Sequence, residues 1–244
     1  MTNSWLATGK RGWLRAVPLA ALLTMVYASS ASAILFTFSG TAGDGRPENA
    51  TAMFTLASNS LTIVLTNTAG PGQLGGISSV LDGIGFTFST APTSLTLSSV
   101  SASGVVTCVS GTSCVAYGGS NPTNYGWGRT GLNPVVLAAG TTSFKPYGIV
   151  NGNADATSDG IPNSQHNPYL LGPVTFVFTV AGWAGLPQLP TITSATGYFG
   201  TVPDTVAGVT TEPNTEIPEP TTLALLGSGL FGLPLLRRRR GERG

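Results

Sequence analysis

The chain has 244 residues, of which 41% are hydrophobic and only 9% are charged, whereas a typical soluble domain carries about 25% charged residues. Eleven basic and ten acidic residues give a net charge of +1, which argues against a generally basic surface of the kind that binds nucleic acid. The 33 glycines and 17 prolines stay below the fraction typical of low-complexity disorder, so we expect the middle of the chain to fold.

The basic residues are concentrated at the two ends of the chain. Eight of the eleven lie either in residues 10–15 or in residues 237–243. Between Ile34 and Glu216 there are three basic and eight acidic residues, which give this central part a net charge of −5. The basic ends therefore require an explanation in terms of topology, and the acidic centre requires a separate one.

The N-terminal segment, residues 1–33, has the three parts of a secretory signal peptide. Basic residues come first, an apolar stretch runs from about Ala16 to Tyr27, and the small residues Ala31 and Ala33 form a site for signal peptidase. The alternative is a retained membrane anchor, but about a dozen apolar residues are short for the roughly 20 that span a bilayer. We expect cleavage after Ala33, which makes Ile34 the first residue of the mature chain.

Residues 34–216 alternate between apolar and polar side chains with the period of β-strands. The alternating runs are rich in Thr, Ser, Val and Phe, and Gly, Asn and Pro separate them. The apolar positions of these runs are Ile34, Phe36, Phe38, Leu61, Ile63, Leu65, Ile84, Phe86, Phe88, Leu95, Leu97, Val174, Phe176, Phe178, Val180, Ile192, Tyr198 and Phe199. The pattern predicts one exported all-β domain, an antiparallel, jelly-roll-like β-sandwich of about eight strands.

The least regular segment, from Gly104 to Gly172, contains the two cysteines of the chain. Cys108 and Cys114 enclose five residues, and in an oxidising compartment they are expected to form a local disulfide. A ring this small contributes less than the roughly 3 kcal/mol of a fifteen-residue loop, so its expected role is to hold a hairpin tip. A metal site would lack partner His or Cys residues, and a redox site would lack the Cys-x-x-Cys spacing.

Three aromatic residues of this segment are candidates for binding sugars. Tyr125, Trp127 and Tyr147 are spaced among glycines, and an exposed aromatic face packs well against the apolar C–H surface of a sugar ring. Burial of the same rings in the core is the alternative for each of them.

A polar stretch in this segment is a candidate calcium site. Asn151, Asn153, Asp155, Thr157 and Asp159 place oxygen-bearing side chains at alternate positions, and calcium takes six to eight oxygen ligands. However, the following glycine lies at the wrong offset for an EF-hand, no bidentate Glu follows, and such loops are commonly solvated turns. No other cofactor is expected.

The single histidine, His166, does not indicate an enzyme. One histidine cannot form a multi-histidine zinc site, and as a general base it needs a nucleophile and an orienting acid that the sequence does not single out. The serines lack a Gly-x-Ser-x-Gly nucleophile motif. We therefore expect a protein without catalytic activity, with a secreted hydrolase as the weakest alternative.

The C-terminal segment contains a short candidate transmembrane helix. The sixteen residues Thr221–Leu236 carry no charge and cover about 24 Å as a helix, somewhat less than a hydrocarbon core of about 30 Å. The arginines that follow, Arg237, Arg238, Arg239 and Arg240, place this end in the cytoplasm by the positive-inside rule. A buried helix with a basic tail is the alternative, but the glycines and proline of this segment suit a membrane helix better.

A stiff acidic motif precedes this helix. Each proline of Pro218-Glu219-Pro220 fixes φ and removes a backbone donor, so the motif stays extended and cannot join the helix. Glu219 is then presented at the membrane surface, where an enzyme can reach it. These three residues are expected to be recognised by an enzyme and to take no catalytic part themselves.

The order Pro-Glu-Pro, short apolar helix and arginine cluster in residues 217–244 resembles the PEP-CTERM sorting signal of Gram-negative bacteria. The resemblance implies that exosortase, a membrane-embedded cysteine transpeptidase-like enzyme, processes a precursor that is held in the inner membrane with its domain in the periplasm. The mature protein is then expected at the cell surface or in the extracellular matrix. The family's link to extracellular polysaccharide further implies a structural or adhesive role in a biofilm, with a sugar-binding module as the alternative.

Overall fold

The computed structural model describes residues 31–70, 73–74, 76–109, 114–140, 146–152, 161, 165–200, 204–210 and 215–216. In these residues fourteen strands form one sheet, and the helices are two short 3-10 turns, η2 (Ile77–Ser79) and η3 (Thr123–Gly126). The described part is therefore all-β, as predicted, but with more strands than the eight expected. No helix in this part has the length and apolar character to cross a membrane. The expected signal peptide up to Ser30 and the expected C-terminal helix lie outside the described residues.

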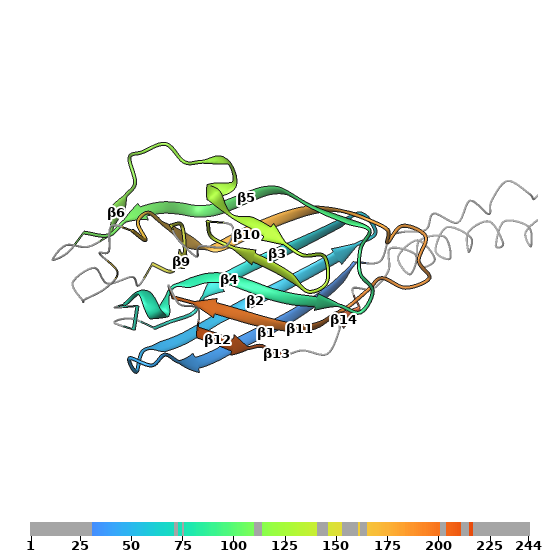
Figure 1. The fold of residues 1–244 in the computed structure, drawn as a ribbon, viewed down its shortest axis with the longest axis horizontal. Coiled ribbons are helices and arrows are strands. Elements are labelled where there is room, and N and C mark those ends of the chain that lie inside the picture. Colours follow the sequence, from blue (N-terminus) through green and yellow to red (C-terminus); the bar gives the residue numbers. More distant parts are fainter. Residues whose placement is uncertain are drawn as a thin grey trace, which may run out of the picture.

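The strands follow one another along the chain as β1 (Ser32–Thr41), β2 (Pro47–Ala57), β3 (Ser60–Asn67), β4 (Leu81–Phe88), β5 (Ser94–Thr107), β6 (Val115–Ala116), β7 (Gly128–Thr130), β8 (Val135–Ala138), β9 (Ile149–Val150), β10 (Tyr169–Ala181), β11 (Ile192–Phe199), β12 (Asp204–Ala207), β13 (Val209–Thr210) and β14 (Thr215–Glu216). The long strands lie along the long axis of the molecule (Figure 1).

The strand order in the sheet is β12-β11-β4-β9-β10-β3-β2-β1-β13, and β5, β6, β7, β8 and β14 pair with members of this path. The pairs are antiparallel except β9–β10, which is parallel. The expectation of a purely antiparallel sheet is therefore wrong at this one pair. The two-residue strand β9 lies between β4 and β10, which run in opposite directions. It must therefore be parallel to one of them, and it is antiparallel to β4.

The two ends of the strand path meet at Gly208. This residue separates β12, which pairs with β11, from β13, which pairs with β1. The N–H of Gly208 donates to the carbonyl of Ala195 at 2.8 Å. A Cβ at this position would lie 2.7 Å from the ring of Phe38 and 3.1 Å from that of Phe36, so only glycine fits without a shift of the core.

Aromatic rings fill the interior. Phe54 of β2 lies 5.8 Å from Phe36 of β1 and 5.1 Å from Phe86 of β4, and both contacts are edge-on. The edge contacts continue from Phe86 to Phe88 and from Phe88 to Trp183, at 5.3 and 5.1 Å. Because β2 and β4 are not neighbours in the strand order, the Phe54–Phe86 contact crosses the interior. Each such pair stabilises the fold by about 1 kcal/mol beyond the burial of its area.

The predicted inward side chains of β1, β3, β4 and β10 are all buried. Burial alternates along β1, β3 and the second half of β10, whereas in β4 every residue except Thr87 is buried. In β5, Leu97 is only partly buried, beside a register shift. In β11, Tyr198 lies on the outward side, over Gly85, while Phe199 is buried. These two adjacent residues point to opposite faces, as the period of a strand requires.

A buried carboxyl group lies beside the strand that closes the sheet. Glu48, near the start of β2, is only 2% exposed. Burial raises the pKa of Glu48 to about 7, and the charge of Asp204 on β12, a hydrogen bond shared with that residue and the charge of Asp44 act in the same direction. The oxygen Oε1 of Glu48 has no hydrogen-bond partner among the described residues. Glu48 is thus best accommodated in its protonated form.

Glu48→Gln should remove a pH dependence from the stability of the domain. The folded-state pKa of Glu48, about 7, lies above its ordinary value of 4.5, so the protonated group contributes stability below pH 4.5, and this contribution is lost as the pH rises through 7. We expect the variant to match the wild type at pH 4 and to be more stable by roughly 3 kcal/mol at pH 8. Denaturant unfolding at both pH values measures the difference.

Asp44→Asn provides a comparison of opposite sign for this experiment. Burial opposes ionisation of Asp44, but the hydroxyl of Ser78, the backbone N–H of Arg46 and the guanidinium of Arg46 together lower the pKa of this carboxyl group. A lowered pKa contributes stability above the ordinary value and loses it as the pH falls. Asp44→Asn should therefore destabilise at pH 8. The assignment is refuted if Glu48→Gln and the wild type have the same pH profile.

Candidate functional site

One face of the sheet carries hydroxyl and apolar side chains without any charge. It is the outward face of β1, β2, β3, β10 and β5, opposite the buried phenylalanines of these strands. We call it the uncharged face. Its outward residues, as the strand register aligns them, are Leu35, Thr37, Thr51, Met53, Thr55, Thr62, Val64, Thr66, Thr175, Val177, Thr179, Thr96, Ser99 and Ser101.

The uncharged face is organised in rows that cross the strands. One row begins with three apolar residues: Leu35 of β1 lies opposite Met53 of β2, and Met53 lies opposite Val64 of β3. The rows on either side of it contain the threonine pairs of β2 and β3, such as Thr55 opposite Thr62. Neighbouring strands are about 4.8 Å apart and alternate residues of one strand about 6.7 Å apart. Such a surface can exchange hydrogen bonds and pack apolar groups, but it cannot form ion pairs.

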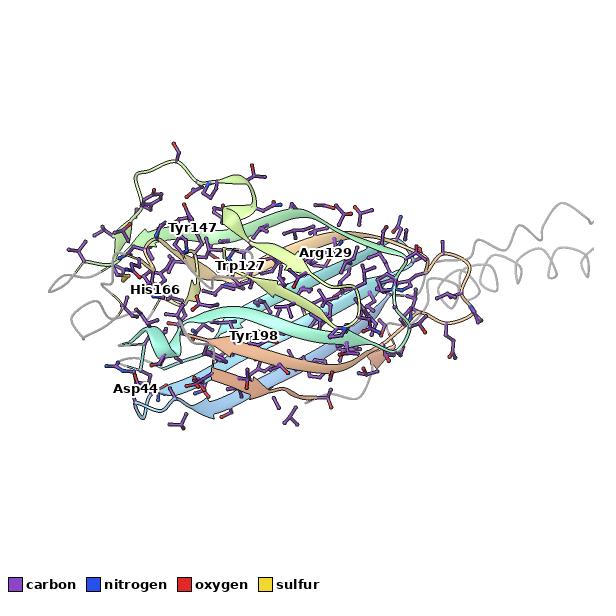
Figure 2. All side chains as sticks on the ribbon, in the orientation of Figure 1. Asp44, Trp127, Arg129, Tyr147, His166 and Tyr198 are labelled. Carbon is purple, nitrogen blue, oxygen red and sulfur yellow. A yellow bond between two sulfur atoms is a disulfide. The ribbon has the colours of Figure 1, made fainter. Side chains whose placement is uncertain are left out.

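Two of the three aromatic residues predicted to stack on sugars are buried. Trp127 is 4% exposed, its ring lies 4.8 Å from that of Phe176, and its Nε1–H donates to the carbonyl of Tyr147 at 2.9 Å. Tyr147 is also buried and has a left-handed φ of 70°. Both residues therefore lie inside the domain (Figure 2), and almost no ring surface of Trp127 is left for a ligand.

The accessible part of this aromatic cluster consists of Tyr125 and Tyr117. Tyr125 is half-buried, and its ring centre lies 6.1 Å from that of Tyr147. Burial raises the pKa of Tyr147, and a hydrogen bond with Tyr117, itself half-buried, adds to this shift. The sequence analysis did not include Tyr117, because only the fold brings it to Tyr147. Of the aromatic residues in this cluster, Tyr117 and Tyr125 are therefore the ones with ring surface accessible to a sugar.

The predicted disulfide between Cys108 and Cys114 is present. Asn167 holds the backbone beside it through both atoms of its amide group. Its Oδ1 accepts from the N–H of Cys108 at 2.8 Å, and its Nδ2 donates to the carbonyl of Cys108 at 2.9 Å. The disulfide and this paired contact together fix the end of β5.

The candidate calcium site is described only at Asn151. The Nδ2 of Asn151 donates to the carbonyls of Asn67 and Ala69, at 3.1 and 2.6 Å. Its side chain therefore links the residue after β9 to the end of β3. Asn153, Asp155 and Asp159 lie outside the described residues. In the part of the chain that is described, no group of three or more His, Cys, Asp or Glu residues could hold a metal ion.

His166, the residue considered as a general base, is buried at the same end of the molecule as Tyr147 (Figure 2). Its ring is 2% exposed, so a substrate cannot reach it from the surface without a movement of the surrounding loops. This placement gives no support to a catalytic histidine.

The two ends of the domain lie side by side. The short strand β14 pairs with the beginning of β1, with Ser32 opposite Glu216 and Ala33 opposite Thr215. β6, which directly follows Cys114, lies toward the other end of the long axis (Figure 1). The candidate sorting residues Pro218, Glu219 and Pro220 follow β14 directly and, like the arginine cluster, lie outside the described residues.

The segment that begins at the last residue of β14 matches a known sorting motif. Residues 216–240 match the PEP-CTERM protein-sorting motif. The chain carries this motif where the sequence predicted it, and the motif indicates an exported protein that exosortase processes. No curated protein and no solved structure matches the chain. The PEP-CTERM motif covers about a tenth of the sequence, so it speaks for the sorting of the protein and not for the activity of its β domain.

Trp127→Ala and Tyr125→Ala should separate a core residue from a surface residue. Removal of the buried Trp127 ring leaves a cavity, and we expect a loss of about 3–5 kcal/mol in the free energy of unfolding. Tyr125→Ala, at a half-buried ring, should cost about 1 kcal/mol. Denaturant unfolding measures both values. Equal losses in the two variants would contradict the placement of Trp127 in the core.

Proposed function

We propose that this protein is a non-catalytic exosortase substrate that ends as a structural or adhesive component of the extracellular matrix. The match of residues 216–240 to the PEP-CTERM motif is the observation that carries the sorting part of the proposal. In this proposal residues 1–33 are a signal peptide, residues 34–216 are the exported domain, and residues 217–244 are the sorting signal.

The precursor passes through a membrane-anchored state in the inner membrane. Thr221–Leu236 spans the bilayer, and the arginines from Arg237 to Arg240 keep the C-terminus in the cytoplasm. The β domain is then in the periplasm, where Cys108 and Cys114 can oxidise. The pairing of β14 with β1 supports this topology, because both membrane-directed segments leave the domain at the same end.

The intact mass of the exported protein tests the sorting proposal. Processing should give a chain that begins at Ile34 and ends near Pro220, without the arginines. Glu219→Ala should leave unprocessed precursor in the inner membrane, because it removes the carboxylate that exosortase reads. Glu212→Ala, which removes an acidic residue before the motif, is the matched control and should be processed normally. A mature protein that still ends at Gly244 would refute the proposal.

The uncharged face supports the matrix part of the proposal. Its threonine and serine hydroxyls can exchange hydrogen bonds with sugar hydroxyls, and the row of Leu35, Met53 and Val64 can pack on the C–H faces of sugar rings. A soluble protein normally carries charges on such a face. A neutral polysaccharide is the partner whose chemistry fits this composition.

In our proposal the uncharged face is the outer side of one layer of a jelly-roll-like sandwich. The contact between Phe54 and Phe86 at 5.1 Å supports two facing layers, because their strands are not paired with each other. The closure of the strand path at Gly208 supports an arrangement in which the chain passes from one layer to the other.

The second candidate function is sugar binding by Tyr117 and Tyr125. The observation that favours it is the partial exposure of both rings, next to the buried Tyr147. This site is small and lies in the irregular segment, whereas the uncharged face extends over five strands. The two candidates therefore differ in the residues that a ligand contacts.

Retention on an insoluble neutral β-glucan distinguishes the two candidates. Met53→Lys places a strongly hydrated charge in the middle of the uncharged face and should lower the bound fraction about tenfold. Leu186→Lys is the matched control, because Leu186 is 39% exposed and Met53 is 42% exposed, but Leu186 lies in the loop after β10. Tyr125→Ala should have little effect. If Tyr125→Ala abolishes retention and Met53→Lys does not, the tyrosine site replaces the uncharged face.

A further inference from the structure

The backbone partners of β14 are the last two residues of the expected signal peptide. β14 consists of Thr215 and Glu216, and its register pairs them with Ala33 and Ser32. Cleavage after Ala33 removes both of these partners. Ile34, the first residue of the mature chain, pairs with Phe54 of β2 on its other side, and the pairing of β1 with β14 ends at Ala33.

The sorting motif begins at the residue that this pairing holds. The match to the PEP-CTERM motif starts at residue 216, and Glu216 pairs with Ser32. In the uncleaved precursor the chain is therefore attached to the sheet up to two residues before Pro218. An extended chain covers about 3.5 Å per residue, so Pro218 lies within about 7 Å of the last paired residue.

The nearest pairing that survives cleavage lies further back in the chain. β13 pairs with β1 at Thr210 opposite Phe36 and at Val209 opposite Thr37, and none of these residues belongs to the signal peptide. Without β14, the last paired residue among those that the structure describes is Thr210, eight residues before Pro218. The same spacing then allows a reach of about 28 Å. Loss of two residue pairs thus lengthens the arm between the domain and the motif about fourfold.

We propose that removal of the signal peptide releases the sorting motif from the domain, so that hydrolysis at the N-terminus has to precede exosortase processing at the C-terminus. The proposal rests on the proposed function. The first reaction is a peptide-bond hydrolysis: water is added across the Ala33–Ile34 bond, which leaves a carboxyl group on Ala33 and an amino group on Ile34. Ser32 and Ala33 depart with the signal peptide, and β14 loses its backbone hydrogen-bond partners.

The order of the two reactions follows from the accessibility of the substrate. A protease or transpeptidase binds its target sequence as an extended, accessible chain, and a segment within a β-ladder has its backbone groups occupied. In the precursor, the residues before the motif are held against β1 at the edge of a folded domain. After hydrolysis, the arm can carry Pro218, Glu219 and Pro220 away from the domain and into the enzyme at the membrane surface.

Insertion of Ser-Thr between Ala33 and Ile34 tests the proposal in the full chain. The signal peptide and its Ala31-Ser32-Ala33 site stay intact, but the exported chain keeps two residues in the positions that pair with β14. In cells that contain exosortase, pulse-labelling and intact mass measure how fast the C-terminal segment is removed. We expect processing to be about fivefold slower than in the wild type, which is the effect of about one hydrogen bond. N-terminal sequencing verifies that each chain begins where intended.

A rescue variant distinguishes release of the motif from other effects of the insertion. Six residues of alternating Gly and Ser, placed between Glu216 and Ile217 of the inserted chain, lengthen the arm while β14 stays paired, and should restore the wild-type rate. Equal rates for the wild type and the Ser-Thr insertion would overturn the inference while the sorting function stands. If exosortase processes neither chain, the sorting function itself fails, and this inference fails with it.

Discussion

The closure of the sheet at Gly208 is the constraint on which the described fold depends. One chain segment supplies β12 to β11 and β13 to β1, so β11 and β1 are both covered, and the path ends in two strands that are consecutive in the chain. This closure requires a glycine at position 208, because a Cβ there would lie 2.7 Å from the ring of Phe38 and 3.1 Å from that of Phe36. The phenylalanine interior and the glycine corner therefore require each other, since bulkier rings or a larger corner residue would open the path.

This closure divides the molecule into regions with different tasks. The pairing of β14 with the start of β1 puts the first and the last described strands at one end. The short strand β6, which directly follows Cys114, and the buried His166 lie toward the other end. Between the two ends, the long strands keep their aromatic side chains inside and their hydroxyl groups outside. In the function that we propose, the sorting machinery and a matrix partner therefore contact different parts of the chain.

The sequence predicted those parts of the fold that depend on strongly alternating side chains. Phe36, Phe54 and Phe86 are all buried, but the strand that contains Phe54 was not predicted, because its inward positions also include Ala50 and Ala52. Alanine is depleted in strands, so the alternation in β2 is weak in the sequence. The short strand β8 was missed for a different reason, since four residues are too few to establish a period.

The site could be predicted only where its chemistry is local in the sequence. The disulfide and the PEP-CTERM motif are short segments, and both were found. The roles of Trp127 and Asn151 depend on partners distant in the sequence, Phe176 for the ring and Asn67 for the amide, so their spacing could not show that they are structural. Similarly, no strand taken alone shows that its outward threonines align with those of its neighbours into one surface.

The absence of charge from the outward face of β1, β2, β3, β10 and β5 has a consequence for the environment in which the protein works. Coulomb attraction between a protein and a matrix polymer weakens as dissolved ions screen it, over about 10 Å in 0.1 M salt. Hydroxyl and apolar contacts do not depend on that screening. Adhesion through this face would therefore keep its strength when a cell moves between fresh and saline water.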